Sequence, residues 1–389
     1  MGIQPAPRTQ RRQGHARVVP LETQRPLTPE PAHIVVVGIG GAGNNAINRM
    51  IDVQLRGVQF VALNTDAQAL ALSQAPEQLC LGESLTHGLG AGGDPSVGAE
   101  AAEASRKQLQ EALSGADLVF LTAGMGGGTG TGAAPVVANI AHEMGALVIG
   151  TVTLPFSFEG SHRRKIAQQG IAALSEFVDA LVTVPNDRLL QVVDRQSTLA
   201  DAFQLADDVL RQGVQGMTEI ITVPGLVNVD FADVRSVMQQ AGMALMSIGD
   251  GRGDLRAEKA ATSAIAGGWL GASIQGAQRI LLNITGGPDL TLFEVTQIAQ
   301  MVREAVDESA DMTFGAVLDP AIRDQIRVTL VAAGMVHPGE KRDRFQRKPE
   351  ANTHARPDEP TPTADSPDAD ASPAPALSTS AGKANGSQV

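Results

Sequence analysis

The chain has 389 residues, of which 43% are hydrophobic, and this length suits two domains plus tails. No run of about 18 apolar residues exists, so no membrane span is expected, and a single cysteine, Cys80, excludes an intramolecular disulfide and fits a reducing cytosol. The net charge of −12 combines +3 in residues 1–32, zero in residues 341–389 and −15 between them, and so acidic a core is a poor nucleic-acid surface.

Short apolar runs alternate with helical patterns after a Pro- and Arg-rich arm, residues 1–32, which has no apolar segment of a secretory signal. The runs that predict buried strands in the first half are 34–37, 58–63, 118–122, 147–152 and 181–184. Helical patterns around 45–51 and 99–113 separate some of them. This alternation predicts a doubly wound parallel sheet.

A long helix is predicted next, because apolar residues recur every three or four positions from Leu199 to Ile221 before Pro224-Gly225 ends the pattern. Strand-like segments at 279–284, 312–318 and 326–332 follow, interleaved with helical patterns near 255–265 and 292–306. The predicted fold class is therefore α/β, with two domains joined by a central helix. The expected boundaries are a disordered arm 1–32, a doubly wound domain 33–198, a central helix 199–223, a smaller α/β domain 224–336 and a disordered tail 337–389.

Three glycine-rich segments lie near the carboxyl ends of predicted strands, where open α/β sheets bind ligands. They are Gly38–Asn45, Gly88–Pro95 and Gly124–Gly132. Glycine permits close backbone approach and a helix N-terminus offers unpaired N–H groups, so both favour a phosphate. The first segment alone equally suits a tight turn or a Rossmann dinucleotide site. Several converging loops indicate a polyphosphate, and no Walker-type phosphate loop is present.

The segment Gly126–Gly132, which reads GGGTGTG, resembles the signature of the tubulin and FtsZ family of GTPases. Asn64–Leu70 and Asn228–Val234 resemble the family as well, and the resemblance extends over roughly residues 33–336. It implies a tubulin/FtsZ-like fold and GTP as the substrate, with Mg²⁺. It also implies head-to-tail assembly of the chain with itself, in the cytoplasm at the bacterial division site.

The resemblance further implies roles for individual residues. The nucleotide contacts that it assigns are Gly40, Gly41, Asn45, Gly127, Gly128, Thr129, Gly130, Thr131, Glu159, Arg163, Asn186, Phe203 and Asp208. Phe203 would stack on guanine, and Asp208 would accept hydrogen bonds from its ring N–H and amino group. Without the resemblance, the expected role of Phe203 is core packing, because it lies on the apolar stripe, and Asp208 is expected on a solvated helix face. The scattered histidines predict no protein-bound metal site.

Asp230 and Asp233 are three residues apart, and this spacing alone favours a role in capping a helix that begins there. The resemblance implies instead that Asn228, Asp230 and Asp233 are catalytic and act on the γ-phosphate of a neighbouring subunit. About 23 helical residues, spanning roughly 35 Å, separate the two regions, so these acids are not expected to reach the nucleotide of their own chain. A head-to-tail contact that repeats without closure builds a filament.

The chain departs from the commonest family pattern in three respects. Asp94 and Asp207 stand where asparagine is frequent, and we expect the added charge to weaken nucleotide binding or increase its dependence on Mg²⁺. The acidic and apolar adaptor peptide at the C-terminus is missing, so membrane contact is expected to be indirect or through weak basic clusters in the arm and tail.

Two alternative functions remain at this point. One is a slowly hydrolysing paralogue that joins filaments as a scaffold, with other division proteins or a second family member as partners. The other is a Rossmann-type NAD-dependent oxidoreductase that uses the first glycine loop. Asp66 would then be its ribose-binding acid.

Overall fold

The computed structural model describes Gly2 and residues 31–190, 194, 196–223, 225–227, 229–267, 274–320 and 322–335. The predicted tail and nearly all of the predicted arm lie outside these residues, as does Asn228. No helix in the described part of the chain is both long and apolar enough to cross a membrane.

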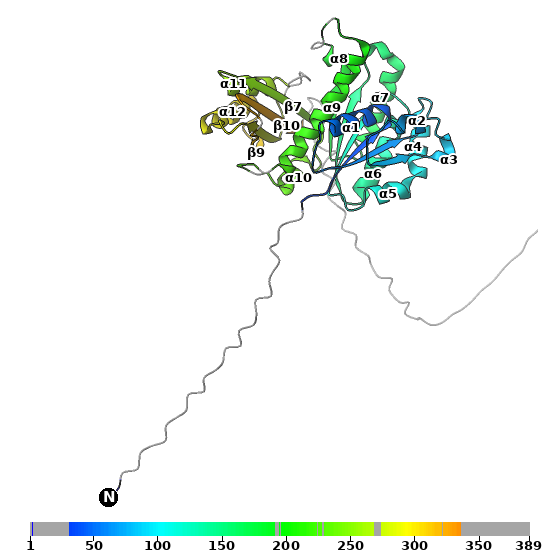
Figure 1. The fold of residues 1–389 in the computed structure, drawn as a ribbon, viewed down its shortest axis with the longest axis horizontal. Coiled ribbons are helices and arrows are strands. Elements are labelled where there is room, and N and C mark those ends of the chain that lie inside the picture. The colour runs from blue at the N-terminus through cyan, green and yellow to red at the C-terminus, as the bar shows by residue number, and fades with distance from the viewer. Residues whose placement is uncertain are drawn as a thin grey trace, which may run out of the picture. The chain divides into compact units, whose positions relative to one another are not determined.

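Ten strands form one sheet in the order β3-β2-β1-β4-β5-β6-β7-β10-β8-β9 (Figure 1). The first six strands are parallel to their neighbours and comprise β1 Ile34–Ile39, β2 Gln59–Asn64, β3 Glu77–Cys80, β4 Leu118–Gly124, β5 Leu147–Leu154 and β6 Ala180–Pro185. The strand order reverses between β1 and β4, which is where open α/β sheets bind ligands. The predicted parallel sheet is confirmed. The short strand β3 was not predicted, because its sequence EQLC has no apolar run.

Helices cover both faces of this sheet, as Figure 1 shows. Alternate residues of β1 belong to different cores: Ile34 and Val36 pack with α1 and α9, whereas Val35 and Val37 pack with α4 to α7. The helices of this half are α1 Gly40–Asp52, α2 Ala67–Leu70, α3 Glu83–Thr86, α4 Pro95–Ala104, α5 Arg106–Ala112, α6 Thr129–Glu143, the 3₁₀ turn η1 Ser157–Glu159, α7 Ser161–Leu174 and α8 Asn186–Leu189. The single helix predicted over 99–113 is two helices, since Ser105 interrupts it and accepts the N–H of Gly82.

The long predicted helix is present as α9, Leu199–Thr222, and leads into the second half of the chain. That half contains α10 Phe231–Met238, β7 Gly242–Arg252, α11 Arg256–Ile265, β8 Arg279–Gly286, α12 Leu292–Ala305, β9 Asp311–Leu318 and β10 Gln325–Ala333. Strand β7 joins the two halves, because it begins parallel to β6 and continues antiparallel to β10.

Strand β7 was not predicted, because glycines interrupt its apolar pattern. Two of them allow α11 to lie directly on the strand. A Cβ at Gly249 would lie 2.1 Å from the carbonyl oxygen of Ala260, and one at Gly251 would lie 1.9 Å from that of Arg256. The residues that obscure the strand in the sequence are therefore those that its packing requires.

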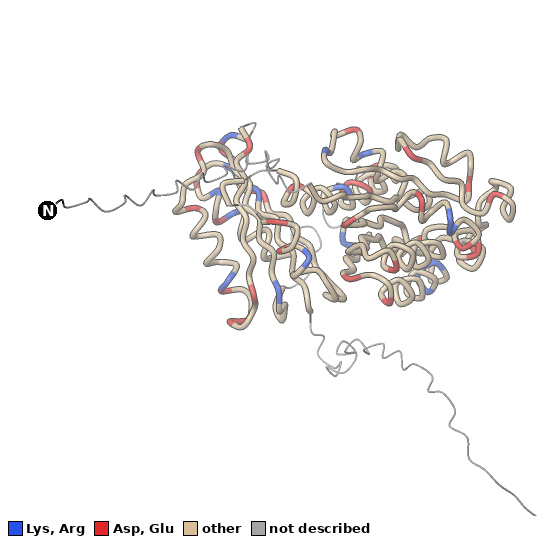
Figure 2. The backbone as a smooth tube through the Cα atoms, turned by 90° about the horizontal axis from the view of Figure 1, so that it is seen from below, with Lys and Arg blue, Asp and Glu red and all other residues tan. Residues whose placement is uncertain are grey.

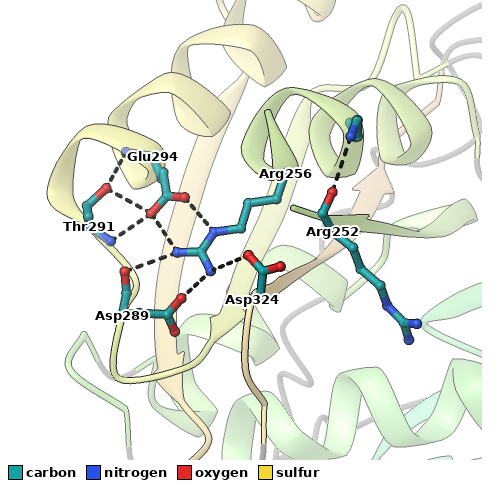
Figure 3. A network of polar contacts seen from close by, with 7 residues as sticks. Arg252, Arg256, Asp289, Thr291, Glu294 and Asp324 are labelled. Carbon is teal, nitrogen blue, oxygen red and sulfur yellow. Dashed lines mark hydrogen bonds and ion pairs between the residues drawn. The ribbon is translucent and has the colours of Figure 1, made fainter. Parts of the chain in front are cut away.

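One buried arginine holds the loops around α11 and α12 together (Figure 3). Arg256 is 8% exposed, and its Nε donates to Glu294 at 2.6 Å. Its other nitrogens donate to the side chain and the backbone carbonyl of Asp289. Glu294 also accepts the N–H of Thr291 and so completes the N-terminal cap of α12. Removing one partner would leave a buried charge uncompensated, which makes this network a determinant of stability.

Acid should weaken this network at Glu294, whose pKa is lowered to about 2 by the hydrogen bonds from Arg256. A carboxyl with a lowered pKa stabilises the fold above its unfolded-state pKa, and this stabilisation is lost as the pH falls toward the folded-state value. Between about pH 4.5 and pH 2, we expect the wild type to lose up to about 3 kcal/mol more unfolding free energy than Glu294→Gln. Urea unfolding across this range measures the difference, with Glu304→Gln, an exposed position on the same helix, as the control.

Candidate functional site

The first glycine loop brings β1, α1 and β4 into backbone contact. A Cβ at Gly38 would lie 2.5 Å from the carbonyl oxygen of Gly43, and one at Gly43 would lie 2.4 Å from that of Thr122. Helix α1 begins without a side-chain cap, so the N–H groups of its first turn remain for a ligand. Gly41 opens onto empty space and Asn45 is exposed one turn later.

The signature loop lies against the first loop. Gly40 has φ +71°, and a Cβ there would lie 3.1 Å from the backbone nitrogen of Gly130. Gly130 itself packs on the carbonyl of Gly124, and Gly127 faces open space. Helix α6 begins at Thr129 without a side-chain cap on Gly128. Two uncapped helix N-termini therefore lie side by side, which suits an extended anion.

The two threonines of the signature have different neighbours. The hydroxyl of Thr129 lies 2.7 Å from that of Thr65, at the end of β2. The hydroxyl of Thr131 is buried and accepts the N–H of Gly126 at 2.8 Å. Because Gly126 has φ +104°, this bond fixes the turn that starts the loop. Thr131 thus supports the loop's shape.

The third glycine loop borders the signature loop. A Cβ at Gly128 would lie 2.9 Å from the backbone nitrogen of Asp94, while Gly92 and Gly93 open onto empty space. The Asp94 carboxylate is the N-cap of α4 and accepts hydrogen bonds from the backbone and hydroxyl of Ser96, which lower its pKa. The added charge at Asp94 is therefore present, but it faces the positive end of a helix dipole.

Two observations fit a phosphorylated ligand that also carries a hydrogen-bond donor, such as a sugar hydroxyl. The open glycines Gly41, Gly92, Gly93 and Gly127 leave a surface that any side chain would fill. Asn186, at the end of β6, is 5% exposed, and its Oδ1 has no hydrogen-bond partner among the described residues. A buried polar atom without a partner costs free energy, so a ligand that donates to it would be stabilised.

Glu159 and Arg163 contact one another at the edge of these loops. Their side chains form an ion pair with a 2.6 Å separation between Arg163 Nη1 and Glu159 Oε2, and Glu159 also accepts the N–H of Phe156. A Cβ at Gly126 would lie 2.9 Å from the carbonyl oxygen of Arg163, so the segment borders the signature loop. The structure thus brings these two predicted nucleotide contacts beside the signature loop.

Phe203 lies near the start of α9 and is not a core residue. It is 39% exposed and meets Phe156 edge to face, with 5.4 Å between ring centroids, while Phe158 stacks on Phe156 at 5.0 Å. Phe156 belongs to the same segment as Glu159. An exposed ring in this position can stack on a planar base.

The acids Asp207 and Asp208 face different neighbours. Asp207 is four residues after Phe203 and so shares its helix face; it is buried, 3.8 Å from Nε of Arg49 on α1. Burial raises the pKa of Asp207 to about 7 against the opposing effect of Arg49. Its added charge is thus partly neutralised near neutral pH. The place of Asp207 on the same helix face as Phe203 was not predicted, although the four-residue spacing between them indicates it.

Asp208 accepts hydrogen bonds from Arg211 at 2.5 Å and from Gln212 at 2.7 Å. Burial alone would raise the pKa of Asp208, but these bonds outweigh it and lower that pKa. The carboxylate that the sequence assigned to the base is therefore already engaged on its own helix.

Asp230 and Asp233 form a capping box at the start of α10. Oδ1 of Asp230 accepts the N–H of Asp233 at 2.9 Å, and Oδ2 of Asp233 accepts the N–H of Asp230 at 3.2 Å. The loop before them is held on β9 by the pairing of Val227 with Ala316. Capping uses one oxygen of each carboxylate, which does not exclude a second role.

The structure separates these acids from the glycine loops. Helix α9 has 24 residues and is about 36 Å long, with Phe203 near its start and Asp230 beyond its end. Figure 1 shows α8 and α10 at opposite ends of α9. The predicted catalytic residues and the predicted nucleotide contacts are thus two groups within one chain.

The model of the Tubulin/FtsZ family GTPase domain matches residues 33–194, and that of the FtsZ family C-terminal domain matches residues 242–336. An FtsZ dimer from M. jannaschii, described as empty, is 43% identical, with 79% of this chain and 90% of that chain covered and a TM-score of 0.75. This chain belongs to the tubulin/FtsZ family. A GTPγS-bound CetZ2 protofilament from Haloferax volcanii shares the fold at 22% identity, with 78% and 94% covered and a TM-score of 0.69.

Family membership confirms the predicted tubulin/FtsZ fold and the GTPase activity. The Rossmann oxidoreductase alternative is wrong, and Asp66 instead caps α2 through the N–H groups of Gln68 and Ala69. No group of three or more His, Cys, Asp or Glu side chains among the described residues could hold a metal.

Proposed function

We propose that this FtsZ-family GTPase forms head-to-tail filaments and hydrolyses GTP, with Mg²⁺, at the interfaces between subunits. Gly40, Gly41, Asn45 and the signature loop from Gly127 to Thr131 bind the phosphates in this proposal. Asn228, Asp230 and Asp233 of the next subunit complete the site, positioning and polarising the attacking water. The proposed place of action is the bacterial division ring, in the cytoplasm.

The separation of the two residue groups along α9 is the observation that supports this proposal. In this proposal the glycine loops bind GTP, and Asp230 and Asp233 are needed to hydrolyse it. Because these acids lie too far from the loops of their own chain, a second copy of the chain supplies them. Leu226 is 70% exposed close to Asp230 in the chain, and such a residue is suited to burial in an interface.

The dependence of GTP turnover on protein concentration tests this directly. We expect phosphate release per subunit to be negligible below a threshold concentration and to rise above it, at the concentration where sedimentation detects filaments. Turnover per subunit that is independent of concentration would contradict a site shared between subunits.

The scaffold alternative rests on Asp94 and Asp207, because both place charge near the phosphates or base. Filaments that form with GTP while releasing phosphate very slowly would favour it. In that case a second FtsZ-family protein would be the expected partner.

The base contact is proposed for the two acids of α9 together with Phe203. The sequence pattern favours Asp208. Asp207 is the alternative, because it shares the Phe203 face and lies beside α1, although asparagine is frequent at this position in the family.

A further inference from the structure

The helix that bears the proposed catalytic acids is short and depends on its surroundings for its position. Helix α10 has eight residues, Phe231–Met238, and an isolated helix of this length is not stable in water. Val234, Val237 and Met238 are buried on its inner face. Asp230 and Asp233, at its N-terminal end, are exposed, so the orientation of the helix sets where they point.

Arg279 of β8 holds the C-terminal end of this helix. Its Nη1 donates to the carbonyl oxygen of Ser236 at 2.7 Å and to that of Gln239 at 3.0 Å. Carbonyls in the last turn lack intrahelical partners, and a cation there also complements the helix dipole. The N–H of Gln240, which could have bonded to Ser236, is instead directed at Asp179. The arginine thus replaces the bonds that the helix lacks.

A second arginine ties the same helix to the other half of the chain. Arg235 donates to the carbonyl oxygen of Gly145, in the turn between α6 and β5, at 3.0 Å. Its guanidinium also lies 5.6 Å from the ring centroid of Phe231, which fixes the side chain along the helix. Helix α10 is therefore held by Arg279 from the β8 side and by Arg235 from the α6–β5 side.

We infer that Arg279 is a positioning residue for GTP hydrolysis, which sets the direction in which Asp230 and Asp233 face the nucleotide of the next subunit. The inference rests on the proposed function, because it presumes that these acids act between subunits. Displacing a reacting group by about 1 Å can reduce a rate by about 100-fold, so a loosened α10 affects turnover more than folding. The hydrogen bonds of Arg279 go to α10 and the residue after it, and not to the glycine loops or α9. We therefore expect GTP binding to be independent of Arg279.

The test compares Arg279→Gln and Arg279→Lys with the wild type. The control is Arg327→Gln, which removes an arginine of β10 that pairs with Asp250 and not with α10. We expect Arg279→Gln to reduce GTP turnover per assembled subunit about 10-fold. Arg279→Lys, which keeps a cation near the carbonyls, should recover part of that loss. GTP affinity, and the threshold for assembly with a slowly hydrolysed GTP analogue, should stay within about twofold.

Three outcomes would overturn the inference. Wild-type turnover in Arg279→Gln while Asp233→Asn is inactive would reject the positioning role and leave the proposed function intact. A raised assembly threshold with unchanged turnover per assembled subunit would mean that the arginine serves the fold alone. Full turnover in Asp233→Asn would reject the proposed function, and this inference with it.

Discussion

Asp233→Asn and Asp230→Asn are each expected to lower GTP turnover by at least about 100-fold, as for the loss of a group that acts in general acid–base catalysis. An asparagine keeps a side-chain oxygen that can accept the N–H bonds of the capping box, so α10 should remain in place. What is lost is the negative charge that polarises the attacking water. Phosphate release at saturating GTP, measured on sedimented filaments, checks the prediction.

Alanine variants at the same two positions separate catalysis from capping. Asp230→Ala also removes the cap, at about 1 kcal/mol of stability, which the thermal unfolding midpoint reports. If the asparagine variants hydrolyse GTP as the wild type does and only the alanine variants are impaired, Asp230 and Asp233 are capping residues and nothing more.

Asp208→Asn is expected to change base specificity from GTP toward xanthosine triphosphate, because the family pattern assigns the base contact to Asp208. A carboxylate can accept both the ring N–H and the amino group of guanine, whereas an asparagine offers one acceptor and one donor. That pair matches xanthine, which has a carbonyl in place of the amino group. We expect the affinity for GTP to fall by about 100-fold or more, since a polar site rejects a mismatched partner strongly. Equilibrium titration with both nucleotides measures the switch.

Asp207→Asn is the matched variant, one residue earlier on the same helix. Asparagine is frequent at this position in the family, so we expect this substitution to leave the preference for GTP unchanged. The reverse result, with the switch in Asp207→Asn alone, would assign the base to Asp207, which shares the helix face of Phe203. A switch in neither variant would remove both acids from the base contact.

The sequence predicted the parts of the fold whose signals are local. The strands of the parallel sheet are apolar runs because both faces are covered, and α9 shows the three- and four-residue spacing of an amphipathic helix. Strand β7 was not predicted, because Gly249 and Gly251 interrupt its apolar run. These glycines are required for the packing of β7 on α11. The sequence of β7 is therefore determined by its contact with α11, and this contact cannot be predicted from a local pattern.

In the candidate site too, local features could be predicted from the sequence, whereas contacts between distant residues could not. The glycine loops could be placed at the ends of strands from the sequence, since their spacing and position are local features. The assignment of the base contact to Asp208 rests on the family resemblance and not on a local pattern, because Asp207 and Asp208 are neighbours in sequence and differ in the residues that α1 and α9 place beside them. The hydrogen bonds from Arg279 to the end of α10 connect residues that are 40 or more positions apart, and no sequence pattern predicts them.

The shared strand β7 makes the sheet mechanically uneven. Only three residue pairs, from Ala180–Gly242 to Val182–Ala244, join β6 to β7, whereas eight pairs join β7 to β10. Figure 2 shows the two halves as two lobes of the backbone. A tensile load that separates them thus acts on a short seam between long, cooperative ladders, and α9 is a second connection beside that seam. The chain should therefore yield at this seam first, and each half should keep its own hydrogen-bonded ladder when the seam opens.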